Sequence, residues 1–421
     1  MAIIRSSKHT LKYCTQSKRE SLSILIDEYR RVLQNLIDIA WEGELLFNGK
    51  PFIPQTSKIN LSSYFPEDVL KSQDTWLSAR ILQAIGKQAC SMLLAATKKR
   101  QKQYFMLAKL QRENEDTSSL QRAIDRQPLV KPNASNANLE LDSRFIDISP
   151  ANNLRSPFDL FVKIGSLGNK LSINVPIKHT KVSRKWESKG VTKKSIRLSP
   201  DNLYLFYEVE PEISEGHGSV AIDQGITTAC TLSDTQVTKK CNHGHDLSSI
   251  LDKLSRRKKG SKGMLEAQRH RDNYIGWSIN QLNFKQYSKV KIEKLTDIGR
   301  GTRRSRKLTH WTYTKINDKI TQTCECLGIE VEAVPNQFRS QRCSSCGYVH
   351  KKNRKGKQFC CQSCGFSHDA DYNAALNLDT ELYDIPSCFR ELKLNLKGFY
   401  WNADSLTTPS GEFIVPQTLK S

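Results

Sequence analysis

The chain has 421 residues and carries 65 lysines and arginines against 43 aspartates and glutamates, which gives a formal net charge of +22 and a pI near 9.5. That length suffices for two or three domains with a well-buried core, and so large a positive surplus makes a polyanion the expected partner. No apolar run approaches the roughly 20 residues that cross a bilayer, and the N-terminus has no apolar stretch of signal-peptide length. We therefore expect a cytoplasmic protein without membrane contacts, in which the 12 cysteines are metal ligands or buried thiols.

Helices are expected to dominate the first third of the chain. Residues 3–14 are typical of a short strand that leads into a helix. The S-x-x-E pattern from Ser17 to Glu20 indicates a capping box, and apolar residues recur after it at helical spacing, which predicts a helix over residues 17–41. A second helix is expected over about 75–104.

The second predicted helix ends in the basic cluster KKRQKQ, and the polar residues 114–138 are expected to form a linker. The apolar faces of both helices indicate ordinary packing in a bundle. Only the basic row of the second helix indicates a side that faces phosphate, with Lys98, Lys99 and Arg100 as the expected nucleic-acid contacts.

Strands are expected from Phe158 to Glu210, where LSINVPIKH and NLYLFYEVE alternate or are rich in β-branched and aromatic residues. The segment between these two strands is strongly basic, so we expect a small β-barrel or sheet with basic loops. Two interpretations remain open at this point: a module that grips a nucleic-acid backbone, or a β domain with a solvated face.

From Gly218 the pattern changes to strands that alternate with helices. A strand that ends in Asp223 is followed by a glycine turn at Gly225, a second strand and a third strand. A basic helix pair follows after Leu251, then a strand with Glu293 near its end, a helix and a last strand. This order is typical of an RNase H-like α/β fold.

Two C-x-x-C pairs lie in the last fifth of the chain, and a glycine follows each pair. A glycine at that place lets the turn tighten, so that backbone amides face the thiolates. Cys360 is the spare cysteine, because Cys361 is the one that forms a C-x-x-C pair. Four thiolates at this spacing predict a closed, tetrahedral, structural Zn²⁺ site, with the ligands Cys343, Cys346, Cys361 and Cys364.

Three carboxylates stand at the ends of apolar segments. Asp223 ends one strand, Glu293 ends another, and Asp371 opens a helix after the cysteines. Each has a simple explanation when taken alone, and for Asp371 that explanation is a helix N-cap. Taken together, three carboxylates from two strand ends and a helix start provide the hard oxygen ligands of a two-Mg²⁺ phosphodiesterase.

The segments VAIDQGI, KIEKL, RSQRCSSCG, CQSCG and DADYNAALNL resemble the RuvC and zinc-ribbon motifs of the TnpB family of transposon-encoded RNA-guided nucleases and of the related compact type V CRISPR effectors. The resemblance covers Gly218 to Asp379. It implies that Asp223, Glu293 and Asp371 are the three catalytic acids, with Asp369 as a neighbouring acid.

The same resemblance implies a fold of α/β, α and β modules: an RNase H-like (RuvC) nuclease domain with an inserted zinc ribbon, an N-terminal helical recognition lobe and a β-barrel wedge domain. The expected boundaries are a first wedge strand at 1–14, the helical recognition domain at 15–135, the wedge domain at 150–215, the nuclease domain at 216–340 and 368–382, the zinc ribbon at 341–367 and a flexible C-terminal tail at 383–421.

The function implied is an RNA-guided DNA endonuclease with structural Zn²⁺ and catalytic Mg²⁺, whose partners are a guide RNA and target double-stranded DNA. The basic helix pair and a lid-like loop from Gly299 would then lie near the nuclease cleft. The expected contacts there are Arg256, Arg257, Lys258, Lys259, Arg303 and Arg304.

Two other functions stay open. One is a guide-RNA-dependent DNA-binding protein or transposition factor that does not cut, against which the three intact acids argue. The other is a guide-free nuclease or transposase of the same fold superfamily, against which the zinc ribbon before the third acid argues. The oligomeric state, and the choice between a transposon-encoded and a CRISPR-associated protein, do not follow from these motifs.

Overall fold

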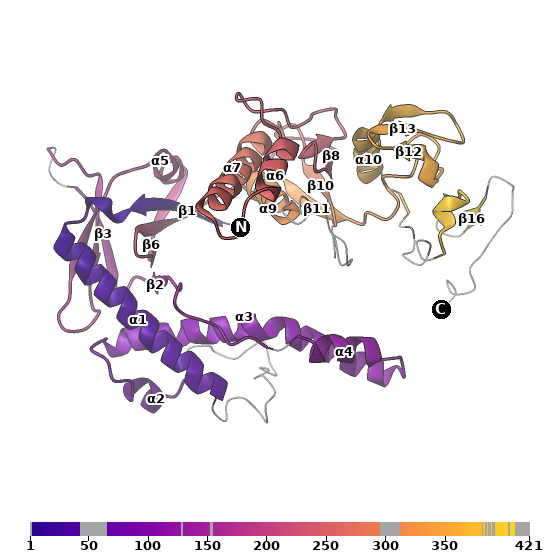
Figure 1. The fold of residues 1–421 in the computed structure, drawn as a ribbon. Coiled ribbons are helices and arrows are strands. Elements are labelled where there is room, and N and C mark those ends of the chain that lie inside the picture. The colour runs from indigo at the N-terminus through magenta and orange to yellow at the C-terminus, as the bar shows by residue number, and fades with distance from the viewer. Residues whose placement is uncertain are drawn as a thin grey trace. The chain divides into compact units, whose positions relative to one another are not determined.

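The structure is a computed structural model in which the chain forms two compact units, Ala2–Glu210 and a C-terminal unit that begins at Pro211 (Figure 1). Among the helices of the described ranges, none is long and apolar enough to span a bilayer. The structure describes residues 2–42, 65–127, 129–151, 155–294 and 312–380, together with 382–383, 385, 389, 392–402 and 405–408.

The N-terminal unit combines two antiparallel sheets with long helices. One sheet has the strand order β1-β7-β6-β2 and the other the order β3-β4-β5. The first strand of the chain therefore pairs with the last strand of the unit, from Ile3 opposite Val209 to Thr10 opposite Asn202. The elements are β1 (Ile3–Thr10), α1 (Gln16–Glu42), α2 (Glu67–Lys71), α3 (Ala79–Arg112), α4 (Ser118–Asp125), β2 (Leu139–Leu141), β3 (Ile146–Pro150), β4 (Leu160–Ile164), β5 (Ile173–Ile177), α5 (Lys181–Glu187), β6 (Gly190–Leu198) and β7 (Asn202–Val209).

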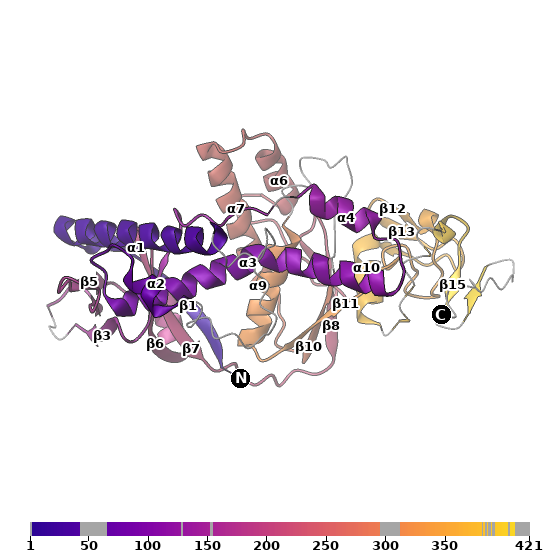
Figure 2. The ribbon, with the colours of Figure 1, turned by 90° about the horizontal axis from the view of Figure 1, so that it is seen from below.

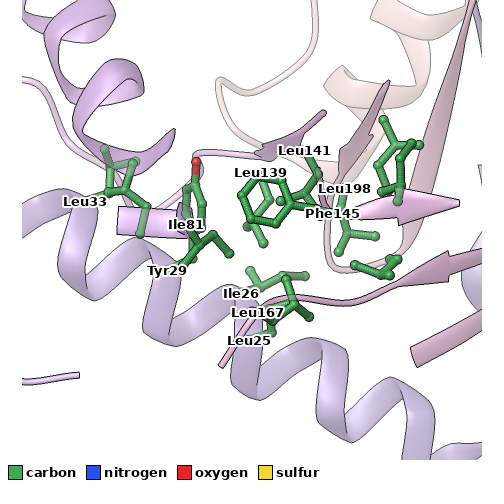
Figure 3. Close-up of a cluster of buried hydrophobic side chains, with 14 of the residues drawn as sticks. Leu25, Ile26, Tyr29, Leu33, Ile81, Leu139, Leu141, Phe145, Leu167 and Leu198 are labelled. Carbon is green, nitrogen blue, oxygen red and sulfur yellow. The ribbon is translucent and has the colours of Figure 1, made fainter. Parts of the chain in front are cut away.

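One apolar cluster joins these helices to both sheets. The apolar positions of α1 recur at helical spacing, so they form one face, and Figure 3 shows Ile26 and Tyr29 of that face close to side chains of other elements, such as Leu139. Tyr29 is fully buried, and its hydroxyl donates a hydrogen bond to Gln88 of α3 at 2.5 Å. A buried tyrosine is stable here because its polar end has a partner.

Several predictions for this unit were wrong in detail. α1 begins at Gln16, so Ser17 lies inside the helix and does not cap it. The side chain of Thr15 instead accepts a hydrogen bond from Lys18 N at 3.4 Å. The second helix is α3, which starts later than predicted and runs to Arg112, so that the cluster KKRQKQ lies in its interior.

The segment predicted as a linker contains the helix α4. The predicted basic loop between the strands is likewise ordered. It contains α5, which begins with a capping box formed by Thr180 and Ser183, and its later part, Gly190–Leu198, forms β6. The exposed faces of these two segments carry polar and basic residues, so their sequences show no apolar periodicity from which the helices could be predicted.

The C-terminal unit is built on a sheet with the order β11-β10-β8-β9. β8 and β10 are parallel, as are β10 and β11, whereas β9 is antiparallel to β8. Its elements are β8 (Ser219–Gln224), β9 (Cys230–Leu232), α6 (Leu247–Ser255), α7 (Lys262–Ile279), β10 (Lys289–Glu293), α9 (Tyr313–Cys326) and β11 (Glu330–Val334), followed by β12 (Arg354–Lys355), β13 (Gln358–Cys360), β14 (Ser367–Asp369) and α10 (Ala370–Asp379).

The core of this unit lies between the sheet and the helices α6, α7 and α9. Val220 and Ile222 of β8 pack there with Ile275 of α7 and Ile316 of α9. Figure 2 shows β8, β10 and β11 with α10 beside them, and α10 packs directly on β8. The predicted third strand was wrong, since the chain after β9 makes only an isolated bridge at Val237.

The predicted flexible tail was also wrong for the residues that the structure describes. Phe389 and Phe399 are fully buried and pack against Phe338 and Val349, which precede them by many residues. The backbones of Val349 and Phe399 exchange hydrogen bonds at 2.8 and 3.0 Å. This segment therefore completes a small core beside the cysteine-containing insertion, with the short elements η5 (Leu394–Leu396), β15 (Tyr400–Trp401) and β16 (Leu406–Thr407).

Candidate active site and metal centre

The three predicted acids lie on elements that meet at one end of the sheet. Asp223 and Glu293 stand at the carboxyl ends of β8 and β10, which are parallel neighbours. Asp371 lies in the first turn of α10, the helix that packs on both strands. A carbon added at Gly225 would lie 2.8 Å from Thr228 O and 3.7 Å from a carboxylate oxygen of Asp371. The glycine therefore lets the turn after β8 close tightly onto Thr228, beside Asp371.

The cap of α10 distinguishes the two neighbouring acids. Asp369 is the N-cap, and its Oδ1 accepts hydrogen bonds from the backbone amides of Asp371 and Tyr372 at 2.9 and 3.1 Å. The simple explanation that made Asp371 the N-cap is therefore wrong. The side chain of Asp371 is buried, and helix capping does not account for that burial.

Two of the three acids, Asp223 and Glu293, have a raised pKa. Burial raises the pKa of Asp223 well above its ordinary value, and the nearby carboxylates of Glu293 and Asp371 raise it further, against the opposite effect of Arg354 and Lys357. Burial also raises the pKa of Glu293 from its ordinary 4.5 to about 7. Carboxylates that are buried together in this way favour a bound cation or a bound proton.

Two basic residues of the cysteine-containing insertion contact the third acid. Arg354 donates to one carboxylate oxygen of Asp371 at 2.8 Å, and Lys357 forms an ion pair with the other oxygen. No motif in the sequence indicates that these two residues contact an acid. A divalent metal ion bound to the carboxylate of Asp371 would share that carboxylate with Arg354 and Lys357 or displace their side chains.

The donors fit a divalent metal. Carboxylate oxygens are the ligands that suit Mg²⁺; Asp223 and Asp371 are buried and Glu293 is half-buried, and the raised pKa values of Asp223 and Glu293 reflect, first of all, that burial disfavours their charged forms. Asp223, Glu293 and Asp371 would hold the ions, which would supply an activated water and charge stabilisation at the phosphate.

The pH dependence of stability tests this electrostatic arrangement. Between pH 4.5 and about 7, the folded protein holds a proton on Glu293 that the unfolded chain has lost, so the free energy of unfolding falls as pH rises through this window. For Glu293 alone the loss amounts to roughly 3 kcal/mol. Chemical denaturation of the metal-free protein at both ends of the window measures the loss. It can be followed by the combined fluorescence of the six tryptophans, of which Trp277 packs against the core of the C-terminal unit.

The variant Glu293→Gln is the control for that measurement, because it has no proton to lose and its unfolding free energy should change less across the window. Mg²⁺ should restore stability at the upper end for the natural protein only. The arrangement would be contradicted if the unfolding free energy of the natural protein fell no more between pH 4.5 and 7 than that of Glu293→Gln.

The four predicted cysteine ligands come together. Among the described residues they are the one group of potential metal ligands whose donor atoms all lie within 4.8 Å of one another. The Sγ atoms of Cys343 and Cys364 are 3.7 Å apart, and those of Cys346 and Cys361 are 3.6 Å apart. Sulfurs around a tetrahedral zinc ion are separated by about 3.8 Å. The group can therefore hold a metal ion such as zinc.

The local backbone of the cysteine group has the geometry that the glycines predicted. Gly347 and Gly365 have φ values of 80° and 74°, a conformation that glycine adopts without strain. The amides of Ser363 and Cys364 point at Cys361 Sγ, at 3.4 and 3.5 Å. Cys360 is exposed and lies outside the ligand group.

The predicted nucleic-acid contacts differ in their exposure in the structure. Lys98 is exposed on α3, and Lys99 lies on the same helix, but its side chain is outside the described residues. Arg100 is buried and donates to the carbonyl of Ile124 at 2.9 Å and to that of Gln127. The prediction of a phosphate contact by Arg100 is therefore contradicted, because its guanidinium holds α4 against α3.

The remaining predicted contacts lie at the turn between α6 and α7 or beyond the described ranges. The basic run at the turn is exposed and is not part of either helix. It consists of Arg256, Arg257, Lys258 and Lys259. Arg303, Arg304 and the loop from Gly299 lie outside the described residues.

Comparison with known proteins supports the resemblance of the motifs. Residues 313–378 match the family model described as Cas12f1-like, TNB domain. The chain is 43% identical over 93 residues to the CRISPR-associated endodeoxyribonuclease Cas12f1 of Sulfoacidibacillus thermotolerans, a match that covers 21% of each protein. It is 30% identical over 95 residues to a TnpB-like protein of Aquifex aeolicus (strain VF5), which covers 21% of this chain and 31% of that protein. The predicted resemblance to both groups is thus confirmed.

These matches span between a fifth and a third of the relatives' length. A solved structure is similar over more of the chain: that of CasPhi-2 (Cas12j) bound to crRNA and phosphorothioate-DNA, with a TM-score of 0.50, 11% identity, and coverage of 89% of this chain and 91% of that chain. At this identity the likeness concerns the fold, and the fold is that of a Cas12 effector with mixed α and β elements.

Proposed function

We propose that the protein is an RNA-guided DNA endonuclease that hydrolyses phosphodiester bonds with Asp223, Glu293 and Asp371. The observation that carries the proposal is the convergence of these carboxylates, two of them buried and one half-buried, from two parallel strands and one helix at a single end of the sheet. The names of the relatives agree with it, since one is an endodeoxyribonuclease and a solved relative in fold carries crRNA and DNA.

The chain's own residues hold the reacting groups in this proposal. Asp223 and Glu293 are fixed by the register of β8 and β10, and Asp371 by the cap that Asp369 provides. The two ions, when bound, supply an activated water and stabilise the leaving oxygen. Arg354 and Lys357 then give up their carboxylate partner and turn to the phosphates of the bound strand.

The metal of the four-cysteine group is zinc in this proposal, and its role is structural. Four thiolates fill a tetrahedral coordination sphere, so that no position remains for water or substrate. The ribbon formed by β12, β13 and β14 packs beside the four cysteines, and its apolar cluster is small. A fold so small generally depends on its metal.

We assign the domains as the sequence predicts them. The helices of the N-terminal unit form a recognition lobe, its sheets a wedge domain, and the sheet of the C-terminal unit a RuvC nuclease domain with the zinc ribbon inserted before α10. The net charge of +22 suits partners that are a guide RNA and a target DNA, which present phosphate along most of their surface.

Sequencing the RNA that copurifies with the protein tests the function. We expect one structured RNA with a variable end segment, and Mg²⁺-dependent cleavage of a DNA that is complementary to that segment. If the complex bound this DNA but left it intact, the alternative would hold, namely a guide-dependent binding protein or transposition factor. Only mixed cellular RNA that high salt removes would contradict guided function altogether.

A further inference from the structure

The helix that carries Asp371 is hydrogen-bonded to the segment that leads into the cysteine group. Asn373 is fully buried. Its Nδ2 donates to the carbonyl of Arg342 at 2.8 Å, and its Oδ1 accepts from the backbone amide of Ser344 at 3.0 Å. The two backbone groups flank Cys343, the first ligand, so the amide of Asn373 holds that ligand on both sides.

Asn377 repeats the contact one turn further along the helix. Residues four apart share a helix face, and Nδ2 of Asn377 donates to the carbonyls of Arg339 and Arg342 at 2.9 and 2.7 Å. Its Oδ1 is buried without a hydrogen-bond partner among the described residues. An unpaired buried oxygen destabilises the fold. The presence of an asparagine at position 377 is therefore best explained by the two hydrogen bonds that its Nδ2 donates to residues 339 and 342.

The other end of the cysteine-containing insertion is attached to the same helix. β14 ends at Asp369 and α10 begins at Ala370 without an intervening loop. The amide of Ala370 donates to the carbonyl of Lys357 at 2.8 Å. α10 is therefore fixed both to the segment that enters the insertion and to the strands that leave it, and Asp371 lies within the first turn of that helix.

We propose that Asn373, supported by Asn377, is a positioning residue that couples the four-cysteine group to the carboxylate site. A metal in the cysteine group orders residues 339–344, these residues hold α10 through the two asparagines, and α10 places Asp371 for its ion. This inference rests on the proposed function, because it takes Asp371 as a ligand of Mg²⁺. Such coupling is reciprocal: Mg²⁺ must strengthen zinc binding by the same factor by which zinc strengthens Mg²⁺ binding.

The reciprocal effect gives a test that does not depend on cleavage. The zinc affinity of the full-length protein is measured by competition with a chromogenic chelator, with and without saturating Mg²⁺. We expect Mg²⁺ to raise the zinc affinity of the natural protein about tenfold. In Asn373→Ala the zinc affinity without Mg²⁺ should fall, because the amide that holds the backbone on both sides of Cys343 is lost, and the effect of Mg²⁺ on zinc affinity should disappear.

Asn353 provides a matched control. It is as buried as Asn377, but its hydrogen bonds stay within the insertion, to the carbonyls of Gln341 and Tyr348 at 2.9 and 3.1 Å and from the amide of Gln362 at 2.9 Å. Asn353→Ala should therefore weaken zinc binding and leave the effect of Mg²⁺ in place.

Two further variants keep the test interpretable. Asn373→Asp has the same size and still accepts from Ser344. At an alkaline pH at which its carboxylate is ionised it cannot donate to Arg342, so it should lose most of the coupling there. Asp371→Asn removes the proposed ligand and should also lose the effect of Mg²⁺ on zinc. In cleavage assays with the copurified RNA, Asn373→Ala should need about ten times more Mg²⁺ for half-maximal rate and reach nearly the natural maximal rate.

The outcomes separate this inference from the proposed function. If the effect of Mg²⁺ on zinc persists in Asn373→Ala and Asn373→Asp, the coupling does not run through Asn373 and the inference is overturned. It is also overturned if the natural protein cleaves DNA while Mg²⁺ leaves its zinc affinity unchanged. Coupling without any cleavage would instead support the inference and contradict the nuclease.

Discussion

Asp223→Asn lowers the rate of Mg²⁺-dependent cleavage by about a thousandfold or more, and it stabilises the metal-free protein at neutral pH. The first effect follows because a metal-bound carboxylate supplies several kcal/mol of transition-state stabilisation, and each 1.4 kcal/mol is about a factor of ten in rate. The second follows because burial and two nearby carboxylates disfavour the charged form of Asp223, and asparagine has the same shape without the charge. Single-turnover cleavage and chemical denaturation measure the two effects.

Asp379, the last residue of α10, is a control with the opposite expectation. Its carboxylate accepts from the hydroxyls of Ser219 and Ser233 at 2.5 and 2.8 Å, and Lys291 contacts it. Asp379→Asn also replaces one aspartate by asparagine, but it should retain cleavage and lower stability by about 1 kcal/mol. Asp223→Asn that cut DNA at the natural rate would remove Asp223 from the catalytic site. Guided DNA binding should survive in both variants.

The positions of Asp223 and Glu293 could be predicted from the sequence because the pattern that marks the end of a strand lies within a few consecutive residues. An apolar, β-branched run that ends in a carboxylate predicts where the strand stops, and parallel neighbours bring Asp223 and Glu293 to one edge. The cysteine group could be predicted for a similar reason, since C-x-x-C spacing and the following glycine fix the geometry of a turn.

Contacts between distant residues could not be predicted in this way. The pairing of Arg354 and Lys357 with Asp371 depends on how the ribbon folds back on α10, and no periodic pattern in the sequence reports it. The C-terminal aromatic cluster is similar: Phe389 and Phe399 are scattered among polar residues, and their burial depends on Phe338 and Val349. Asp369 and Asp371 lie two residues apart. The resemblance favoured Asp371 as the third acid, but the pattern of the residues did not show which of the two caps the helix, and the hydrogen bonds identify Asp369 as the N-cap.

Cys343→Ser abolishes stoichiometric metal binding and unfolds the ribbon, while the sheet of the C-terminal unit stays folded. The thiolates replace a hydrophobic core here, since the apolar cluster around Cys343, Tyr348 and Phe359 is small and the binding energy of the metal is folding energy. The sheet core, in contrast, forms a separate apolar cluster that contains no residue of the ribbon. Zinc content per chain and the rate of proteolysis within residues 341–367 report the two events.

Cys360→Ser separates ligand loss from the mere loss of a thiol. Cys360 is exposed, adjoins the ligand Cys361 and lies outside the group of four, so its replacement should leave zinc content at one ion per chain. Normal zinc content in Cys343→Ser would contradict the four-cysteine site. Because α10 joins the ribbon directly, Cys343→Ser should also slow cleavage although every catalytic acid is intact, and this loss should resemble that of Asp371→Ala more closely than that of a surface substitution.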